Sequence, residues 1–279
     1  MANLRIIHRN IFDDRSAIAM VSGSQALGFS LSNMGNDTKN KTFRTTNLTN
    51  PAFQVAWSTG QTISGVALAF TNLIAGSTFQ ITLYDATSGG TLLLDTGPVN
   101  VDYSYDAPIG FSSIGSASFA YGGGSNVAAF FTETSGVRRM EIAFTSAGNP
   151  DGYIEVSRVI AGAYWEPVDN ADYGATISFV DNTTGQRTSA GGFVTDRGTI
   201  HREMSFSLNA MSATDRESLN NLFRSIGKSQ PLFISLTPGL SNTESEQFGA
   251  LYGKFDDGLS TQFVEKVEGS FKEERDRDW

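Results

Sequence analysis

Short apolar runs separated by turn-forming residues recur along the first half of the chain. In residues 79–84, Phe79, Ile81 and Leu83 alternate with polar or amphipathic positions, so a strand would place these three side chains on one face. Further runs lie at 63–70, 91–94, 127–131, 139–144 and 153–159, and no helical periodicity separates them. Evenly spaced short strands predict a β-sandwich or a jelly roll over residues 22–165.

The pattern changes near Pro167, where turn formers follow the last of these strands. We place a domain boundary after Trp165 and a second domain at 166–279. Its apolar runs, at 175–180, 231–236, 248–255 and 262–271, again predict strands. Asp196-Arg197-Gly198 lies between two more runs, which predicts a hairpin over residues 193–207.

One helix is predicted in this second domain, at residues 213–226. Ser212 can cap its first turn together with Asp215, and Gly227 can end it. The apolar positions between them follow helical spacing, at Leu219, Leu222, Phe223 and Ile226. The second domain is therefore expected to consist of strands with one packed helix, which makes the chain mainly β.

The sequence leaves two alternatives at each end of the chain. Residues 1–21 carry an apolar run with Leu4, Ile6 and Ile7, and they are expected to form either an arm or edge strand that docks on a neighbouring subunit or the first strand of the following domain. The charged tail, residues 272–279, is expected to lead away from the body. Its last residue, Trp279, is either frayed or a hydrophobic plug for a partner.

Composition narrows the classes of function. The chain has 29 Gly, 7 Pro and no Cys, which suits strands joined by tight turns and excludes disulfides, thiolate zinc sites and cysteine nucleophiles. The net charge of −9 is concentrated after residue 165, and no basic stripe is present, so direct nucleic-acid binding is not expected. No apolar run reaches the roughly 20 residues of a membrane span, so we expect no membrane insertion and synthesis in the cytoplasm.

No catalytic site is predicted. The two histidines, His8 and His201, lie in different regions, and His201 is expected on a sheet surface without a nucleophile or metal ligand nearby. The adjacent acidic pairs would point to opposite faces of an extended chain, which does not suit a glycan hydrolase. We predict a non-catalytic protein without cofactor or metal.

Two resemblances each cover about half of the chain. The segments 51–68, 139–142 and 153–159 resemble the galactose-binding-like (discoidin) jelly roll, although cysteines and a clear sugar-binding set are lacking. The segments 158–167, 173–174, 187–188, 196–198, 202, 206–208 and 227–233, with the helix between them, resemble distal tail proteins of long-tailed bacteriophages. That second resemblance implies that residues 166–279 form a small β-sandwich or split barrel with one packed helix. It also implies a structural protein of the virion tail that stacks as a ring, six-fold first and three-fold next, between the tail tube protein and the baseplate hub and fibre proteins.

Candidate contact residues follow from these two interpretations. Subunit contacts are expected from the N-terminal segment, the predicted hairpin and the C-terminus, namely from Leu4, Ile6, Ile7, Arg197, His201, Arg202 and Trp279. The alternative function is a carbohydrate-binding module that contacts a host-surface glycan. It would need aromatic side chains at a loop rim, and the candidates are Tyr103, Tyr105, Phe111 and Tyr121.

Overall fold

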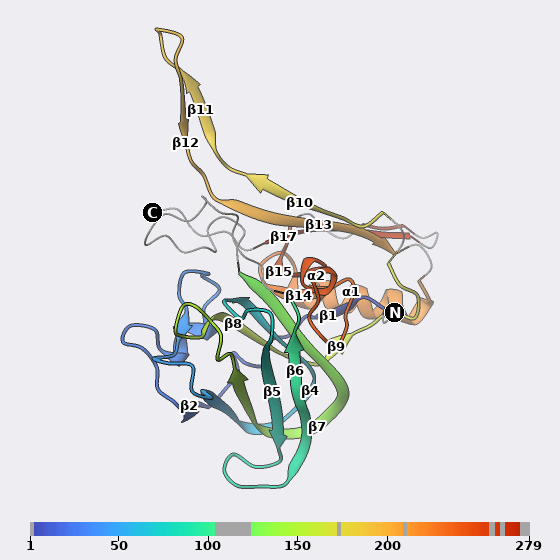
Figure 1. The fold of residues 1–279 in the computed structure, drawn as a ribbon. Coiled ribbons are helices and arrows are strands. Elements are labelled where there is room, and N and C mark those ends of the chain that lie inside the picture. Colours follow the sequence, from blue (N-terminus) through green and yellow to red (C-terminus); the bar gives the residue numbers. More distant parts are fainter. Residues whose placement is uncertain are drawn as a thin grey trace.

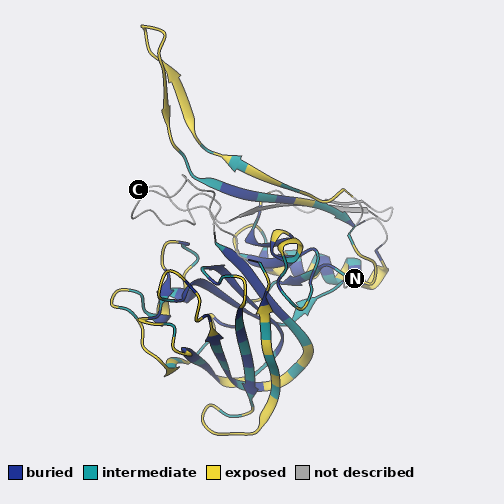
Figure 2. Cartoon of the chain, in the orientation of Figure 1, coloured by how far each residue is buried: buried dark blue, intermediate teal, exposed yellow. Residues whose placement is uncertain are grey.

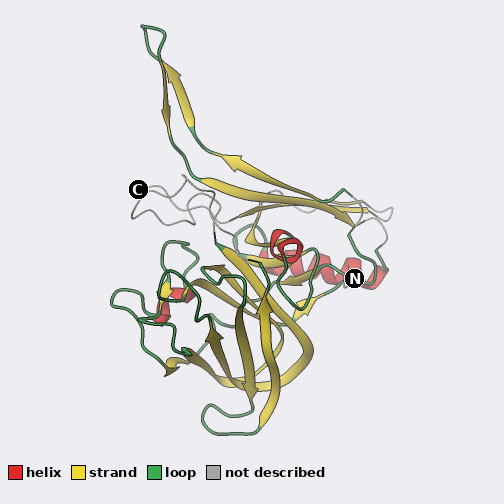
Figure 3. Cartoon of the chain, viewed as in Figure 1, coloured by secondary structure: helices red, strands yellow, loops and turns green. Residues whose placement is uncertain are grey.

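The computed structural model describes residues 3–103, 124–171, 174–208, 211–256, 260–262 and 266–273, the last two ranges by their backbone alone. Two large antiparallel sheets, a two-stranded ribbon and a few short helices make up this part of the chain (Figures 1 and 3). The prediction of a mainly β protein is therefore confirmed. The two sheets pack against each other, and the ribbon extends away from both (Figure 1).

The first sheet has the strand order β3-β8-β4-β7-β5-β6, and β2 pairs with β4. Its strands are β2 (Ala17–Ser22), β3 (Phe43–Arg44), β4 (Ala52–Thr71), β5 (Ser77–Tyr84), β6 (Leu92–Val101), β7 (Ser125–Thr145) and β8 (Glu155–Gly162). A short 3-10 helix, Leu31–Gly35, follows β2.

Two long strands turn this sheet into a sandwich. β4 and β7 pair along their whole lengths, but their register shifts at three points between Ala56 and Gly65. Before these shifts β4 adjoins β2, and after them it adjoins β8. Bulges bend a strand and increase its twist, so β4 and β7 cross from one layer to the other. The layers are β2, β5 and β6 with one half of the long pair, and β3 and β8 with the other half.

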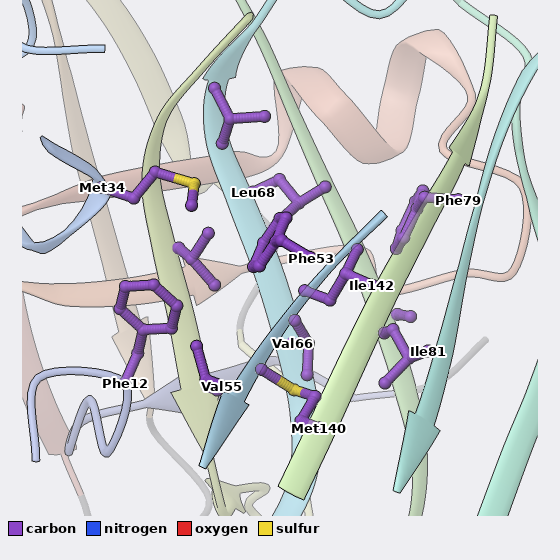
Figure 4. Close-up of a cluster of buried hydrophobic side chains, with 14 of the residues drawn as sticks. Phe12, Met34, Phe53, Val55, Val66, Leu68, Phe79, Ile81, Met140 and Ile142 are labelled. Carbon is purple, nitrogen blue, oxygen red and sulfur yellow. The ribbon is translucent and has the colours of Figure 1, made fainter. Parts of the chain in front are cut away.

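The core lies between these layers. Figure 4 shows Phe53, Val55 and Val66 from the two halves of β4 in one cluster with side chains of β5 and β7. Trp57 is fully buried, and its indole Nε1 donates a hydrogen bond to the carbonyl oxygen of Ile11 at 2.7 Å. The predicted sandwich thus encloses a core of aliphatic and aromatic side chains.

The second sheet has the order β10-β13-β17-β15-β14-β1-β9, and β16 pairs with β17. Its strands are β1 (Arg5–Ile7), β9 (Tyr164–Trp165), β10 (Thr176–Asp181), β13 (Ile200–Leu208), β14 (Leu232–Ser235), β15 (Ala250–Phe255), β16 (Ser260–Gln262) and β17 (Lys266–Glu273). The chain leaves the first sheet at the end of β8 and enters the second sheet with β9. It therefore passes between the sheets at Ala163, two residues before the predicted domain boundary.

The N-terminal segment is divided between the sheets. β1 lies inside the second sheet, with β14 on one side and β9 on the other, while β2 pairs with β4 of the first sheet. Leu4, Ile6 and Ile7 are 0–1% exposed. The prediction of a docking arm that offers these three residues to a neighbouring subunit is therefore wrong, because the chain buries them in its own core.

The predicted helix is confirmed at its predicted limits, as α1 (Ala213–Ile226). The Ser212 hydroxyl accepts the backbone N–H of Asp215 at 3.0 Å, and Gly227 ends the helix with a positive φ of 56°. Leu219, Leu222 and Ile226 are buried against the second sheet. A further short helix, α2 (Glu244–Phe248), precedes β15 and was not predicted.

The ribbon consists of β11 (Thr184–Arg187) and β12 (Phe193–Asp196), which pair only with each other. It continues the pair β10 and β13, so residues 176–208 form one long hairpin (Figure 1). The prediction of a hairpin that turns at Asp196-Arg197-Gly198 is therefore wrong, since 193–196 and 200–208 lie on the same arm. The chain reverses at residues 188–192 instead, where Gly191 has a φ of 83°.

Candidate functional site

The ribbon carries an exposed apolar surface. All eight of its strand residues are exposed, including Phe193 at 64% and Val194 at 60% (Figure 2). The Phe193 ring lies across Gly185, where any Cβ would collide with it. The Arg187 guanidinium lies 5.9 Å from the centre of the same ring. Cationic, aromatic and aliphatic groups are thus displayed together at the far end of the hairpin.

The base of the ribbon is held by local hydrogen bonds. The Asn182 N–H donates to the Thr199 carbonyl oxygen at 3.1 Å, and a Cβ on Gly198 would collide with the Asn182 backbone. The Asp181 carboxylate accepts the Thr183 hydroxyl at 2.6 Å and the Thr183 N–H at 2.8 Å. These two hydrogen bonds lower the pKa of Asp181, the hydroxyl contributing most.

Three of the predicted subunit contacts lie near this base. Arg197 is exposed, as a contact would require. His201 and Arg202 are only 2% and 4% exposed, so the prediction that His201 lies on a sheet surface is wrong, and both side chains are too deeply buried for the subunit contacts predicted for them. His201 Nε2 lies 3.3 Å from a Glu203 carboxylate oxygen. Trp279 lies outside the described residues.

A shallow groove of about 580 Å³ opens beside the start of β10. Its apolar walls come from Ile177 of β10, Leu236 after β14 and Phe248 of α2, and Glu244 also lines it. Phe248 packs on Phe179 with ring centres 6.1 Å apart, and both rings are substantially exposed, at 37% and 45%. The groove therefore adjoins a second apolar surface of the molecule.

A buried ionic cluster ties the two sheets together. Arg158 of β8 is 3% exposed, and its guanidinium nitrogens lie 2.6 Å and 2.8 Å from the carboxylate oxygens of Asp13 and 3.0 Å from Asp37. It also donates to the Tyr252 hydroxyl of β15, at 3.0 Å, and that hydroxyl donates to Asp37 at 2.8 Å. The cluster thus joins strands of both sheets to the segments that carry Asp13 and Asp37.

Electrostatics in this cluster favour the charged arginine. Burial alone would lower the pKa of Arg158, but Tyr252, Asp13 and Asp37 outweigh it, so the pKa is raised. Burial raises the pKa of Tyr252 well above its usual value, which keeps its hydroxyl protonated. This cluster was not predicted from the sequence, although an arginine directly followed by the apolar residues Val159, Ile160 and Ala161 is a signal that could have marked it.

Further contacts hold the second domain to the first. Asn242 accepts the backbone N–H of Ala128 at 2.7 Å and donates to the Asn100 carbonyl oxygen at 2.9 Å. Nearby apolar side chains from both sheets form one cluster, which includes Phe70, Phe233 and Tyr252. The two domains therefore share a continuous buried interface.

A cavity of about 430 Å³ lies beside the ionic cluster, lined by His8, Arg158 and the end of α1 among others. Burial lowers the pKa of His8, and the neighbouring charge of Arg9 lowers it further. The Nδ1 atom of His8 is buried and has no hydrogen-bond partner among the residues that can be placed. A neutral imidazole is thus favoured here at neutral pH.

One end of the sandwich gathers aromatic and polar groups. The Arg44 guanidinium lies 4.1 Å from the ring centres of both Phe29 and Tyr153, and it is paired with Glu155 at 3.1 Å. Burial raises the pKa of Tyr153. Asp151 is exposed beside this set and accepts a hydrogen bond from the Asn72 amide at 2.8 Å.

Of the four predicted glycan contacts, one lies away from the group around Arg44, and three cannot be assessed. Tyr103 is half-buried, and its carbonyl oxygen accepts the Gln247 side-chain amide at 2.6 Å. Tyr105, Phe111 and Tyr121 fall outside the described residues. Within the described ranges no group of three or more His, Cys, Asp and Glu is placed to hold a metal ion. No helix in that part of the chain is both long and apolar enough to cross a membrane.

Comparisons with known proteins point to carbohydrate-binding modules as structural neighbours. No protein-family model matches the sequence, and curated proteins give no match. A chitosan-binding module from a chitosanase/glucanase of Paenibacillus sp. IK-5 has 16% identity and a TM-score of 0.40, over 56% of this chain and all of the module. The lectin domain of lectinolysin, complexed with Lewis B antigen, has 15% identity and a TM-score of 0.37 over 55% and 95% of the two chains.

A fucose-binding module of Streptococcus pneumoniae has 13% identity and a TM-score of 0.36, over 55% of this chain and 95% of the module. These neighbours belong to the galactose-binding-like jelly-roll class that the sequence predicted for the first domain. With TM-scores below 0.5, this likeness does not show what the chain binds.

Proposed function

We propose that this protein is a structural subunit that associates with copies of itself through the ribbon, and that the resulting assembly is the tail tip of a long-tailed bacteriophage. In this role it joins the tail tube protein to the baseplate hub and fibres. It is made in the host cytoplasm and functions in the virion tail, without catalysis or a cofactor.

The ribbon is the observation that carries the proposal. An isolated two-stranded hairpin is at best marginally stable in water, because neither of its faces is covered. β11 and β12 bury none of their residues within the chain and expose Phe193 and Val194. A second protein surface that covers the ribbon would stabilise it, and an assembly provides such a surface.

The more specific assignment to a tail tip rests on the sequence. The segments around Trp165, Gly198 and Gly227 that resemble distal tail proteins lie on β9, at the base of the ribbon and at the end of α1. They surround the second sheet, which is the part expected to form a ring. The first domain then lies outside this ring as an addition to it.

Size-exclusion chromatography with light scattering, followed by negative-stain imaging, tests the proposal. We expect rings, six-fold first and three-fold second, at micromolar concentration. A monomer at every concentration up to the millimolar range would overturn the self-association. Rings that fail to bind purified tail tubes would overturn the tail-tip assignment alone.

A second candidate function is glycan binding by the first domain. The observation that favours it is the group formed by Tyr153, Phe29, Arg44 and Asp151, since aromatic rings beside planar polar groups suit sugar surfaces. The similar modules named above bind chitosan, Lewis B antigen and fucose according to their descriptions. Both functions are compatible if the first domain touches the host surface.

Glycan-array binding by the whole chain tests this candidate. We expect Tyr153→Ala to abolish any binding and Tyr84→Ala to leave it unchanged, because Tyr84 is also half-buried and stacked with an arginine, at 4.0 Å from Arg139, but lies outside the group. Absence of binding by the unaltered chain would exclude this function. Equal loss in both variants would contradict the assigned site.

A further inference from the structure

The apolar groove beside β10 cannot be filled by the ribbon of the same chain. Ile177 lines the groove and lies on β10, from which the hairpin continues outward through Arg187. Ten extended residues separate the two positions and span roughly 30 Å. The paired strands lead away from the body (Figure 1), so the tip is directed away from its own groove.

The ribbon and the groove match each other in chemistry. The ribbon displays Phe193, Val194 and the cationic Arg187. The groove is walled by Ile177, Leu236 and Phe248, and it carries the exposed carboxylate of Glu244. Its volume is about 580 Å³. Pockets that bury ligands have volumes of roughly 300–1,000 Å³, so this groove can hold several side chains.

From this match we infer that the ribbon of one copy of the chain docks in the groove of the next copy, with Phe193 and Val194 against Phe248 and Arg187 beside Glu244. This inference rests on the proposed self-association and names its two surfaces. Each copy then contributes one ribbon and one groove to different neighbours.

The contact is therefore heterologous, which means that two different surfaces meet. Such contacts produce a closed ring when the rotation between neighbours closes, and otherwise a filament. Because the ribbon and the groove of each copy engage different neighbours, assembly continues beyond a dimer. A contact between two ribbons would instead be isologous and would end at a dimer.

Mixing two defective variants separates these geometries. Phe193→Asp with Val194→Ser disables the ribbon, and Phe248→Asp disables the groove. Each variant alone is expected to be monomeric by light scattering, with at least a 10-fold weaker self-association than the unaltered chain. A 1:1 mixture is expected to give heterodimers and nothing larger, since one intact ribbon and one intact groove remain.

The matched control is Leu27→Asp, which changes a fully exposed leucine of the first domain and should leave assembly unaltered. Far-ultraviolet circular dichroism checks that all variants are folded. Arg187→Glu and Glu244→Arg should each weaken assembly, and the two together should restore it.

Cross-linking provides a second measurement that does not depend on the stability of the variants. The chain has no cysteine, so Val194→Cys with Ser245→Cys introduces one thiol on the ribbon and one in the groove. Oxidation should give a ladder of covalent oligomers, whereas each single cysteine should give dimers at most. If the unaltered chain assembles but the ladder is absent and Phe248→Asp assembles normally, the docking inference is overturned and the proposed function stands. If the unaltered chain stays monomeric, both are overturned.

Discussion

Strand β8 and the ribbon of β11 and β12 each contain eight residues in extended conformation, but the chain treats them in opposite ways. Every residue of β8 is buried, and every residue of the ribbon is exposed (Figure 2). β8 even buries Arg158, with its charge balanced by Asp13 and Asp37. The first region is stabilised within the chain, whereas the second needs a surface that the chain does not provide.

This difference assigns separate roles to the two regions. Loss of a large side chain in the sandwich should affect the free energy of unfolding, because it leaves a cavity. Loss of a side chain on the ribbon should affect association alone. Substitutions along the molecule, from the core outward, test whether stability and association divide in this manner.

The largest effect is expected in the sandwich core. Trp57→Ala should reduce the free energy of unfolding by about 3–5 kcal/mol, since the ring is fully buried and its hydrogen bond to Ile11 is lost as well. Urea denaturation followed by circular dichroism measures the change. Trp57→Phe should cost less, because most of the apolar volume remains. Equal effects of the two substitutions would contradict the role given to packing.

The ionic cluster between the sheets should come next. Arg158→Met should cost about 2 kcal/mol, because Tyr252 and the two carboxylates lose their shared partner, although both carboxylates are about 40% exposed and can be solvated. Calorimetry should also show whether one unfolding transition divides into two. If Arg158→Met is as stable as the unaltered chain, the cluster does not help to hold the two domains together.

At α1 the expected loss is smaller. Ser212→Ala removes the hydroxyl that accepts the Asp215 N–H and should cost about 1 kcal/mol. Ser212→Asn, measured in the same urea titration, should retain most of the stability because its side chain can also cap. If Ser212→Ala leaves the free energy of unfolding unchanged, packing of Leu219 and Leu222 alone maintains the helix.

The free energy of unfolding should depend slightly on pH, and we expect this dependence to come from His8. Burial lowers its pKa in the folded chain, so the unfolded chain binds the proton more tightly. Stability should therefore fall as the pH drops below about 6.5, the usual pKa of histidine, and level off below the folded pKa. His8→Gln should remove this component between pH 7.5 and 5.5 in urea titrations. If His8→Gln has the same pH profile as the unaltered chain, another group causes the dependence on pH.

The smallest effect on stability is expected on the ribbon. Phe193→Ser should change the free energy of unfolding of the monomer by less than about 0.5 kcal/mol, because the ring is mostly in solvent. The measurement is a urea titration at a concentration low enough to prevent association. A large loss would mean that Phe193 supports the hairpin itself, and the contrast with β8 would disappear.

The sequence was informative where structure depends on neighbouring residues. The limits of α1 followed from Ser212, Gly227 and the spacing between them, and the alternation at Phe79, Ile81 and Leu83 marked β5. The long hairpin was misjudged because Asp196-Arg197-Gly198 has the composition of a turn. Gly198 is needed there for close passage of the Asn182 backbone, which is a property of the opposite strand.

Long-range pairing explains the other misses. The apolar run of Leu4, Ile6 and Ile7 fits an exposed arm and a central strand equally well, and only pairing with β14 distinguishes them. The partners of Arg158 come from three distant segments, so they could not be identified from the residues next to it in the chain. Of the candidate subunit contacts, Arg197 is exposed, and its role in a contact stays a prediction. The apolar pair Phe193 and Val194 belonged to the predicted hairpin but was not named in that list.

The central place of β1 has a consequence for biosynthesis. Ile6 pairs with Trp165 of β9 and with Ile234 of β14, so during synthesis β1 waits for partners that are made roughly 160 and 230 residues later. The sandwich, whose strands are contiguous in the chain, can close during that interval. The second sheet can be completed only after β14, β15 and β17 have been made, so the ribbon is synthesised before the sheet that holds it is finished.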